Sequence, residues 1–239
     1  MSGIWICDVN GVLVDSKLTV YQAFSATATR YRFSFTERDF QRAKDRPLLD
    51  AYRVLDPGSD PYVLREFHLC HVRDRIANVR AFPGVREVLS AARAAGIRVG
   101  AATADGETAE AALVDNGLYP FIDCLVTQQE VKRAKPHPDL LLRILRLFGV
   151  DRHIPDEEDV VCVGDTASDI EAGRAAGVRT IGVTYGVSLE SEIRAAEPDY
   201  IITSFDEMRQ FLSRSMRPSA ASQHVTPAGP LSNQLRDAR

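Results

Sequence analysis

Four short polar segments of this sequence stand where apolar, strand-like runs end. Asp8 and Asn10 follow the apolar run at residues 4–7, and Gly11 behind them permits a sharp turn. Carboxylates can act as nucleophiles or bind hard cations such as Mg²⁺, and lysine and threonine can bind an anion. If the runs are strands of one parallel sheet, these side chains meet at its carboxyl edge, where ligands bind. The other three segments carry Thr103, Lys135, and Asp165 with Asp169.

From residue 81 onward, helical and strand-like periods alternate along the chain. Strands are expected at residues 97–102, 121–126, 160–163, 180–183 and 200–202, with helices at about 85–95, 107–116, 141–148 and 167–176. Alternating units of this kind fold as right-handed crossovers around a parallel sheet. We therefore predict a doubly wound, Rossmann-like α/β core made of residues 1–16 and 81–213.

Between these two parts, the period is helical throughout. Thr36 and Asp39 are spaced as a capping box, Pro47 can begin a helix, and a turn cluster at residues 56–61 precedes a longer helix at about 62–76. Residues 17–80 are thus predicted to form an inserted, all-helical cap. Residues 214–239 contain few large apolar side chains, which predicts a flexible C-terminal tail.

Composition narrows the classes of function. The 239 residues are 45% hydrophobic, enough for a substantial core, and the net charge of −4 comes without a basic patch for nucleic acid. No apolar run approaches the roughly 20 residues of a membrane span, and the residues before Asp8 lack the basic flank and the length expected of a signal peptide. We expect a cytoplasmic protein whose four cysteines are reduced, structural thiols. No prediction of oligomeric state follows from the sequence.

The segment from Asp8 to Val12 resembles the first motif of the haloacid dehalogenase superfamily, Asp-x-Asp-Gly-(Thr or Val). The resemblance extends over about residues 3–205. It includes Thr103, the run around Lys135, and Gly-Asp-Thr-Ala-Ser-Asp at residues 164–169. It is closest to the helical-capped branch that contains phosphoglycolate phosphatase and β-phosphoglucomutase. The sequence departs from the motif at Asn10, where these phosphatases carry a second aspartate.

The resemblance implies a role for each matching position. Asp8 would be the nucleophile that forms an aspartyl-phosphate, Lys135 would neutralise charge, and the Thr103 hydroxyl would bind a phosphoryl oxygen beside Ala104. Mg²⁺ would be held by Asp8, the backbone carbonyl of Asn10 and Asp165, with Asp169 on the metal or orienting its waters. In the cap, a solvated basic face is the default interpretation of the basic clusters; if they bind substrate, Lys44 and Arg46 are the expected residues, because the family's substrate-contacting loop falls near them.

Asn10 decides how active such an enzyme can be, because an amide cannot serve as the general acid and base. Without a general acid and base at this position, turnover should be about 10²- to 10⁴-fold slower. Three hypotheses remain: an inactivated or slow Mg²⁺-dependent phosphatase of a small phosphorylated metabolite, a phosphonoacetaldehyde-hydrolase-like enzyme with Lys44 forming a Schiff base, or a non-catalytic phosphometabolite-binding protein. A mutase would need more polar cap contacts, and a dehalogenase would not use the metal motif. We favour the phosphatase.

Overall fold

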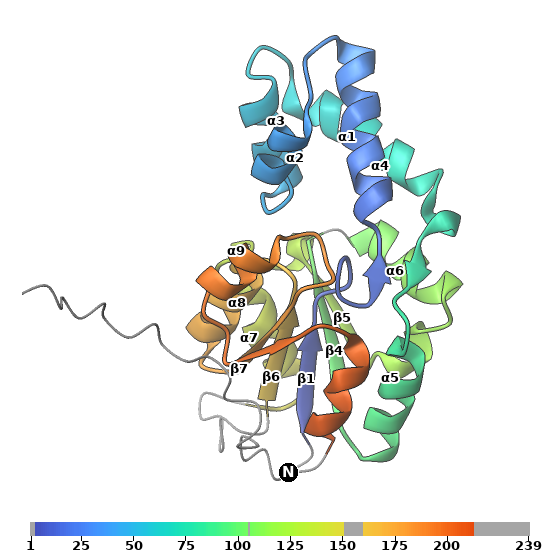
Figure 1. Cartoon of the computed structure of the whole chain (residues 1–239), viewed down its shortest axis with the longest axis vertical. Helices are drawn as coiled ribbons and strands as arrows, with labels where there is room; N and C mark the ends of the chain where they lie inside the picture. Colours follow the sequence, from blue (N-terminus) through green and yellow to red (C-terminus); the bar gives the residue numbers. More distant parts are fainter. Residues whose placement is uncertain (1–2, 105, 151–159, 213–239) are drawn as a thin grey trace, which may run out of the picture.

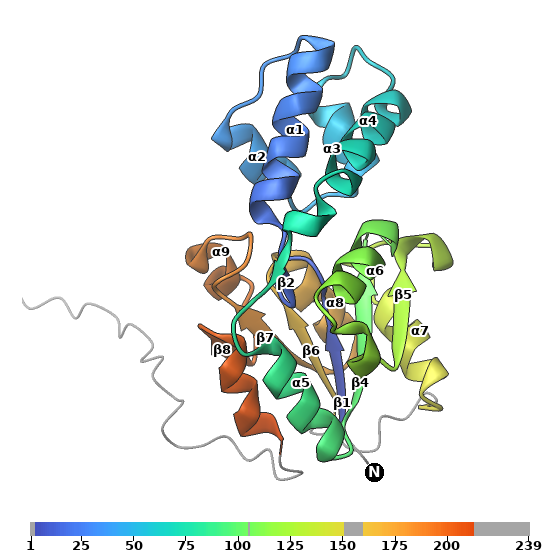
Figure 2. The same cartoon turned by 90° about the vertical axis from the view of Figure 1, so that its right-hand side faces the viewer.

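The computed structural model describes residues 3–104, 106–150 and 160–212. A six-stranded sheet with helices on both faces forms the lower part of the molecule, and a group of helices stands above one end of it (Figures 1 and 2). The tail predicted at residues 214–239 lies outside the described residues. Within the described ranges, no helix is both long and apolar enough to cross a bilayer.

The sheet confirms the predicted doubly wound α/β class. All its strand pairs are parallel, and its order is β5-β4-β1-β6-β7-β8. The chain therefore adds strands on one side of β1, then crosses β1 and adds the rest on the other side. The strands are β1 (Ile4–Cys7), β4 (Arg98–Thr103), β5 (Cys124–Thr127), β6 (Val160–Gly164), β7 (Arg179–Val183) and β8 (Tyr200–Ile202).

Helices cover both faces because alternate residues of the central strand point to opposite sides. Trp5 and Cys7 belong to one buried cluster, and Ile4 and Ile6 belong to another. The first cluster includes side chains of α5 (Val85–Ala94), α6 (Gly106–Asp115) and the 3₁₀ segment η5 (Phe205–Phe211), and the second includes those of α7 (Asp139–Leu147) and α8 (Ala167–Ala176). The shorter elements are η2 (Tyr119–Phe121), η3 (Gln128–Glu130) and α9 (Glu190–Ala195).

The cap has its own aromatic core. Phe24, Phe40 and Tyr52 are buried together, and the rings of Phe24 and Phe35 stack with their centroids 5.6 Å apart. The predicted capping box is present, with Thr36 at the start of its helix. The helices are α1 (Lys17–Tyr31), α2 (Glu37–Ala43), α3 (Leu48–Leu55) and α4 (Pro61–Arg73), followed by η1 (Ile76–Asn78).

Two short strands join the cap to the core. In an antiparallel ribbon, β2 (Val14–Asp15) pairs with β3 (Arg80–Ala81), so the chain enters and leaves the cap side by side. The predicted all-helical segment extends to Arg80, but Arg80 belongs to β3, so the helical segment ends earlier. Two-residue strands are too short to show a period in the sequence, and only their pairing defines them.

Candidate active site

The predicted edge of the sheet brings Asp8 and Asp165 together from distant parts of the chain. Cys7 at the end of β1 is in register with Val163 of β6, and the Asp8 amide donates to the Val163 carbonyl at 2.9 Å. Asp8 and Asp165 thus leave neighbouring parallel strands in the same direction. Strand order reverses at β1, and such a switch point opens a crevice at the carboxyl ends of the strands.

At this crevice, Lys135 contacts residues of three elements: Asp8 after β1, Ala102 of β4 and Asp169 of α8. Its Nζ donates to Asp8 Oδ1 at 2.7 Å and to the Ala102 carbonyl at 2.9 Å, and it forms an ion pair with Asp169 Oδ1 at 2.6 Å. The side chains of Lys135, Asp8 and Asp169 are only 11%, 13% and 3% exposed. An ammonium has three donors, so these contacts use all of them and hold the lysine in one orientation.

Asp169 uses its second oxygen to start a helix. Its Oδ2 accepts from the Thr166 hydroxyl at 2.7 Å and from the Thr166 amide at 3.1 Å, a capping box at the beginning of α8. The carboxylate therefore links the helix to Lys135. A direct bond from Asp169 to a metal stays a prediction.

Two glycines make room for the Asp165 carboxylate. Gly11 adopts a left-handed φ of 83°, and a Cβ at this position would lie 2.0 Å from Asp165 Oδ2. A Cβ on Gly186 would lie 2.3 Å from the Asp165 Cβ. The Val187 amide donates to Asp165 Oδ2 at 2.7 Å. Only residues without side chains permit this approach, so Gly11 and Gly186 help to define where the carboxylate lies.

Burial of these carboxylates perturbs their protonation. Burial raises the pKa of Asp8 to about 7, although the Lys135 ammonium opposes the shift and Asp169 adds to it. Burial, together with the negative charges of Asp169 and Asp8, raises the pKa of Asp165 well above its usual value. Burial would lower the pKa of Lys135, but the two carboxylates it contacts raise it. One ammonium thus faces three acidic groups, which would carry excess negative charge if all three were ionised.

This donor set fits a hard divalent cation. A cation beside Asp8 and Asp165 would neutralise the excess charge, and carboxylate oxygens are the ligands that Mg²⁺ prefers. In the part of the chain that the structure describes, no three His, Cys, Asp or Glu side chains gather as a metal cluster. Mg²⁺ does not require one, since it is commonly held by one or two carboxylates and keeps several waters. The residues present therefore fit Mg²⁺.

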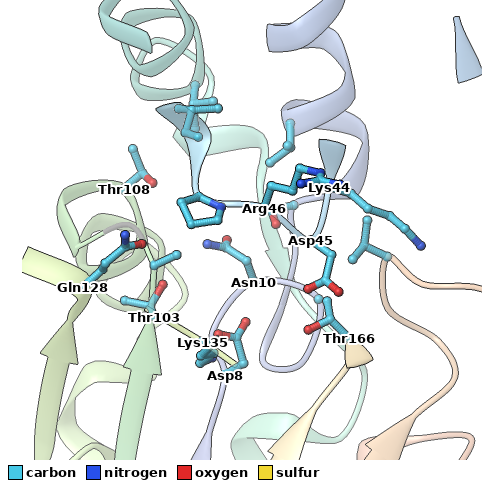
Figure 3. Close-up of a pocket in the computed structure, with 18 of the residues that line it drawn as sticks. Asp8, Asn10, Lys44, Asp45, Arg46, Thr103, Thr108, Gln128, Lys135 and Thr166 are labelled. Atoms are coloured by element: carbon cyan, nitrogen blue, oxygen red, sulfur yellow. Dashed lines mark hydrogen bonds and ion pairs between the residues drawn. The ribbon is translucent and has the colours of Figure 1, made fainter. Parts of the chain in front are cut away.

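The core residues predicted to bind substrate line one cavity of about 480 Å³ between sheet edge and cap (Figure 3). Thr103 is buried at its floor, and Asn10 is partly buried and points into it. Ala104 is exposed beside Thr103. Asp8, Lys135, Asp165 and Asp169 line the same cavity.

The two predicted cap residues also line the cavity but differ in their contacts. Lys44 forms an ion pair with Glu192 of α9, and its side chain is 3% exposed. This contact joins cap to core and does not present the amine to Asp8. Arg46 is exposed, and its Nε donates to the Arg42 carbonyl at 2.9 Å. Substrate binding by either residue remains a prediction.

Asp45, between these two cations, was not identified from the sequence. It lines the cavity, and its Oδ1 accepts from the Ser168 hydroxyl at the start of α8. Burial raises the pKa of its carboxyl. In the sequence, Asp45 lies within a basic run that resembles a solvated surface, and no local signal indicates that this loop descends onto the core.

Comparison with known proteins identifies the family. The model of the haloacid dehalogenase-like hydrolases matches residues 5–183, and the chain belongs to this family. The probable phosphatase IndB of Dickeya dadantii is 30% identical over 218 residues, which cover 87% of this chain and 92% of IndB. The pyrophosphatase PpaX of Oceanobacillus iheyensis is 25% identical over 202 residues, covering 84% and 92% of the two chains.

Solved structures support the fold. A predicted phosphoglycolate phosphatase from Haemophilus somnus has a TM-score of 0.77 at 19% identity, covering 88% of this chain and 98% of that one. CbbY from Rhodobacter sphaeroides in complex with phosphate has a TM-score of 0.73 at 19% identity, covering 87% and 96%. At these identities the likeness concerns the architecture alone.

Proposed function

We propose that this protein is a Mg²⁺-dependent phosphatase of a small phosphorylated metabolite that acts through an aspartyl-phosphate at Asp8. The observation that carries the proposal is the buried contact of Lys135 with Asp8 and Asp169, next to Asp165, at the carboxyl edge of the sheet. Membership of the hydrolase family and the phosphatase names of its relatives support it.

Each residue has a task that phosphoryl transfer requires. Asp8 attacks the phosphorus in line with the leaving oxygen, and Lys135 balances charge on the nucleophile and on the phosphoryl oxygens. Thr103 hydrogen-bonds a phosphoryl oxygen from the neighbouring strand. Mg²⁺, when bound by Asp8, Asp165 and the residue 10 carbonyl, would supply positive charge to the developing transition state. Asp169 holds Lys135 in position.

Asn10 limits the rate of this reaction. Its position next to the nucleophile is where a proton must reach the leaving oxygen and where water must later be activated against the aspartyl-phosphate. An amide can orient a water by hydrogen bonding, but it cannot exchange a proton near neutral pH. We therefore expect slow turnover, with substrate and metal binding retained.

The test is phosphate release from a panel of phosphomonoesters and pyrophosphate, with and without Mg²⁺, by the native chain and by Asn10→Asp. Asn10→Asp should be faster by about 10²- to 10⁴-fold, and chelation should abolish release by both. Mg²⁺ binding is measured separately by calorimetry, with Asp165→Asn as the control that weakens it. Release independent of Mg²⁺ would contradict the proposed cofactor.

The same experiment distinguishes the proposed phosphatase from a non-catalytic binding protein. If Asn10→Asp releases no phosphate from any compound while both forms bind phosphonate analogues, the chain binds phosphometabolites without turning them over. Release of phosphate from phosphonoacetaldehyde alone would point to the phosphonate chemistry. Among the described residues, no contact favours the phosphonate chemistry, because Lys44, the lysine that would form the Schiff base, pairs with Glu192.

A further inference from the structure

We infer that the substrate's leaving group is uncharged and has an apolar body, and that the cap would receive this body while the core receives the phosphate. The inference rests on the proposed phosphatase function and names its substrate class. It separates this chain from enzymes whose leaving group is itself an anion, such as phosphate or glycolate. The distribution of apolar and charged side chains around the cavity supports the inference.

Apolar side chains form a hydrocarbon wall on the cap side of the cavity. Helices α1, α3 and α4 all contribute to it, and several of its side chains are almost completely removed from solvent. Leu49 lines the cavity without belonging to the aromatic core of the cap, and it is partly exposed. An anion placed against such a wall would lose its hydration without compensation. The wall comprises Val20, Phe24, Leu48, Leu49, Leu69 and Val72.

His68 is the titratable group on the inner part of this wall, and it is neutral. Its Nδ1 is hydrogen-bonded to the Tyr52 hydroxyl at 2.8 Å, and its ring lies edge-on to Phe24 with centroids 4.6 Å apart. Burial, with a smaller contribution from His71, lowers its pKa to about 3. His68 therefore offers no positive charge to a second anionic group at neutral pH.

Among the described residues, the cations that line the cavity are either paired with a carboxylate or exposed to water. Lys135 is held by Asp8 and Asp169, and Lys44 by Glu192. Arg65 pairs with Glu66 at 2.5 Å. The remaining two cations, Lys17 and Arg46, are exposed to water, which screens their charge.

The charge that does reach inward from the cap is negative. Asp45 is the cap carboxylate that lines the cavity, and its contact with Ser168 places it beside the start of α8. A leaving group with its own negative charge would be repelled by Asp45 and by the core carboxylates. A neutral leaving group avoids this repulsion and gains by burying hydrocarbon, at about 25 cal/mol per Å².

The test compares two ligands that are alike at phosphorus and differ in the attached group. Benzylphosphonate carries a neutral ring, and phosphonoacetate carries a carboxylate. Calorimetry with the native chain and Mg²⁺ should show tighter binding of benzylphosphonate, by roughly ten- to a hundredfold, as expected for burying one apolar side-chain-sized group. With Asn10→Asp, kcat/KM should follow the same order for benzyl phosphate and 2-phosphoglycolate, which both release primary alcohols.

A charge introduced into the wall provides the matched control. Leu49→Lys should weaken benzylphosphonate about tenfold and strengthen phosphonoacetate. Val54→Lys introduces the same charge in the same helix α3, at an exposed residue outside the cavity lining, and should change neither affinity. Thermal unfolding of both variants establishes that they are folded. An effect of Val54→Lys as large as that of Leu49→Lys would overturn the assignment of the wall.

The outcomes separate this inference from the proposed function. If the native chain prefers phosphonoacetate, or Asn10→Asp hydrolyses pyrophosphate or 2-phosphoglycolate best, the inference is wrong and the phosphatase proposal stands. If neither phosphonate binds, the inference is overturned as well. If, in addition, Asn10→Asp releases no phosphate from any compound of the panel, the proposed function fails with it.

Discussion

The two sides of the cavity differ in how they treat polar groups. At the core edge, Asp8, Lys135 and Asp169 are buried and bonded to one another. Across the cavity, the cap presents hydrocarbon, a neutral histidine and the carboxylate of Asp45, which accepts from the Ser168 hydroxyl. Buried charges are tolerated only where partners hold them, and the parallel strand ends supply those partners. The core edge therefore supplies the charged side chains that the proposed chemistry needs, whereas the cap is suited to selecting a substrate by its shape and polarity.

The largest expected effect removes the nucleophile from the core side. In the Asn10→Asp background, Asp8→Ala should lower phosphate release on the order of 10⁴-fold or more, because no other group is proposed to attack phosphorus. An assay of phosphate release measures this loss. Thermal unfolding should show that the variant remains folded, since Lys135 keeps its contact with Asp169. Undiminished turnover would contradict the assignment of Asp8.

Gly11→Ala tests the close packing at the core edge. The left-handed backbone alone costs about 1–2 kcal/mol for a residue with a Cβ, and the new atom would also displace the Asp165 carboxylate. We expect a larger loss in the free energy of unfolding, together with about 10- to 100-fold weaker Mg²⁺ binding.

Gly149→Ala is the control for that experiment. Gly149 has a similar φ of 71°, but nothing lies within 4 Å of the position of its Cβ. The Gly149→Ala variant should therefore lose only the unfolding free energy that the left-handed backbone costs, and it should bind Mg²⁺ normally. Equal effects of the two substitutions, by urea denaturation and calorimetry, would show that the Asp165 contact is unimportant.

His68 gives the cap side a dependence on pH. Because burial lowers its pKa from 6.5 to about 3, the unfolded chain binds a proton more readily than the folded chain. The stability associated with neutral His68 is fully present above pH 6.5 and is lost as the pH falls toward 3. Between pH 7 and pH 5, the native chain should lose about 2 kcal/mol more unfolding free energy than His68→Gln. Parallel urea titrations at the two pH values measure this difference, and identical losses would contradict it.

The smallest effect concerns the contact between the two sides. Glu192→Gln removes the partner of Lys44, and because Glu192 is 40% exposed we expect a loss of about 1 kcal/mol. If the ion pair holds the cap on the core, KM should rise about fivefold with kcat unchanged. Glu190→Gln, which removes an exposed pair with Arg194 inside α9, is the control and should leave KM unaltered.

Much of the fold could be predicted because it depends on short-range patterns. The helix at residues 167–176 agrees with α8, and the capping box at Thr36 is present as expected. The strand expected from residue 121 begins at Cys124, because Tyr119–Phe121 forms a 3₁₀ turn around Pro120. The β2–β3 ribbon was missed, since its strands are defined only by each other.

Some residues of the candidate site could be predicted from the sequence and others could not. Asp8, Thr103, Lys135 and Asp165 follow strands or motifs, so their meeting at one edge could be predicted once a parallel sheet was expected. Asp45 and the Lys44–Glu192 pair could not, because they depend on the path of a loop between two cap helices and on its distance from α8 and α9.

The sequence by itself determined the order of strands and helices along the chain, because periodicity and capping act over a few residues. It also determined the family and the polar residues that end each strand. Only the tertiary structure decided which partner each charge would have. Lys135 reaches Asp169, Asp165 fits against Gly11, and Lys44 turns to Glu192. Electrostatic energies depend on distance and burial in three dimensions, and residues far apart in the chain supply both.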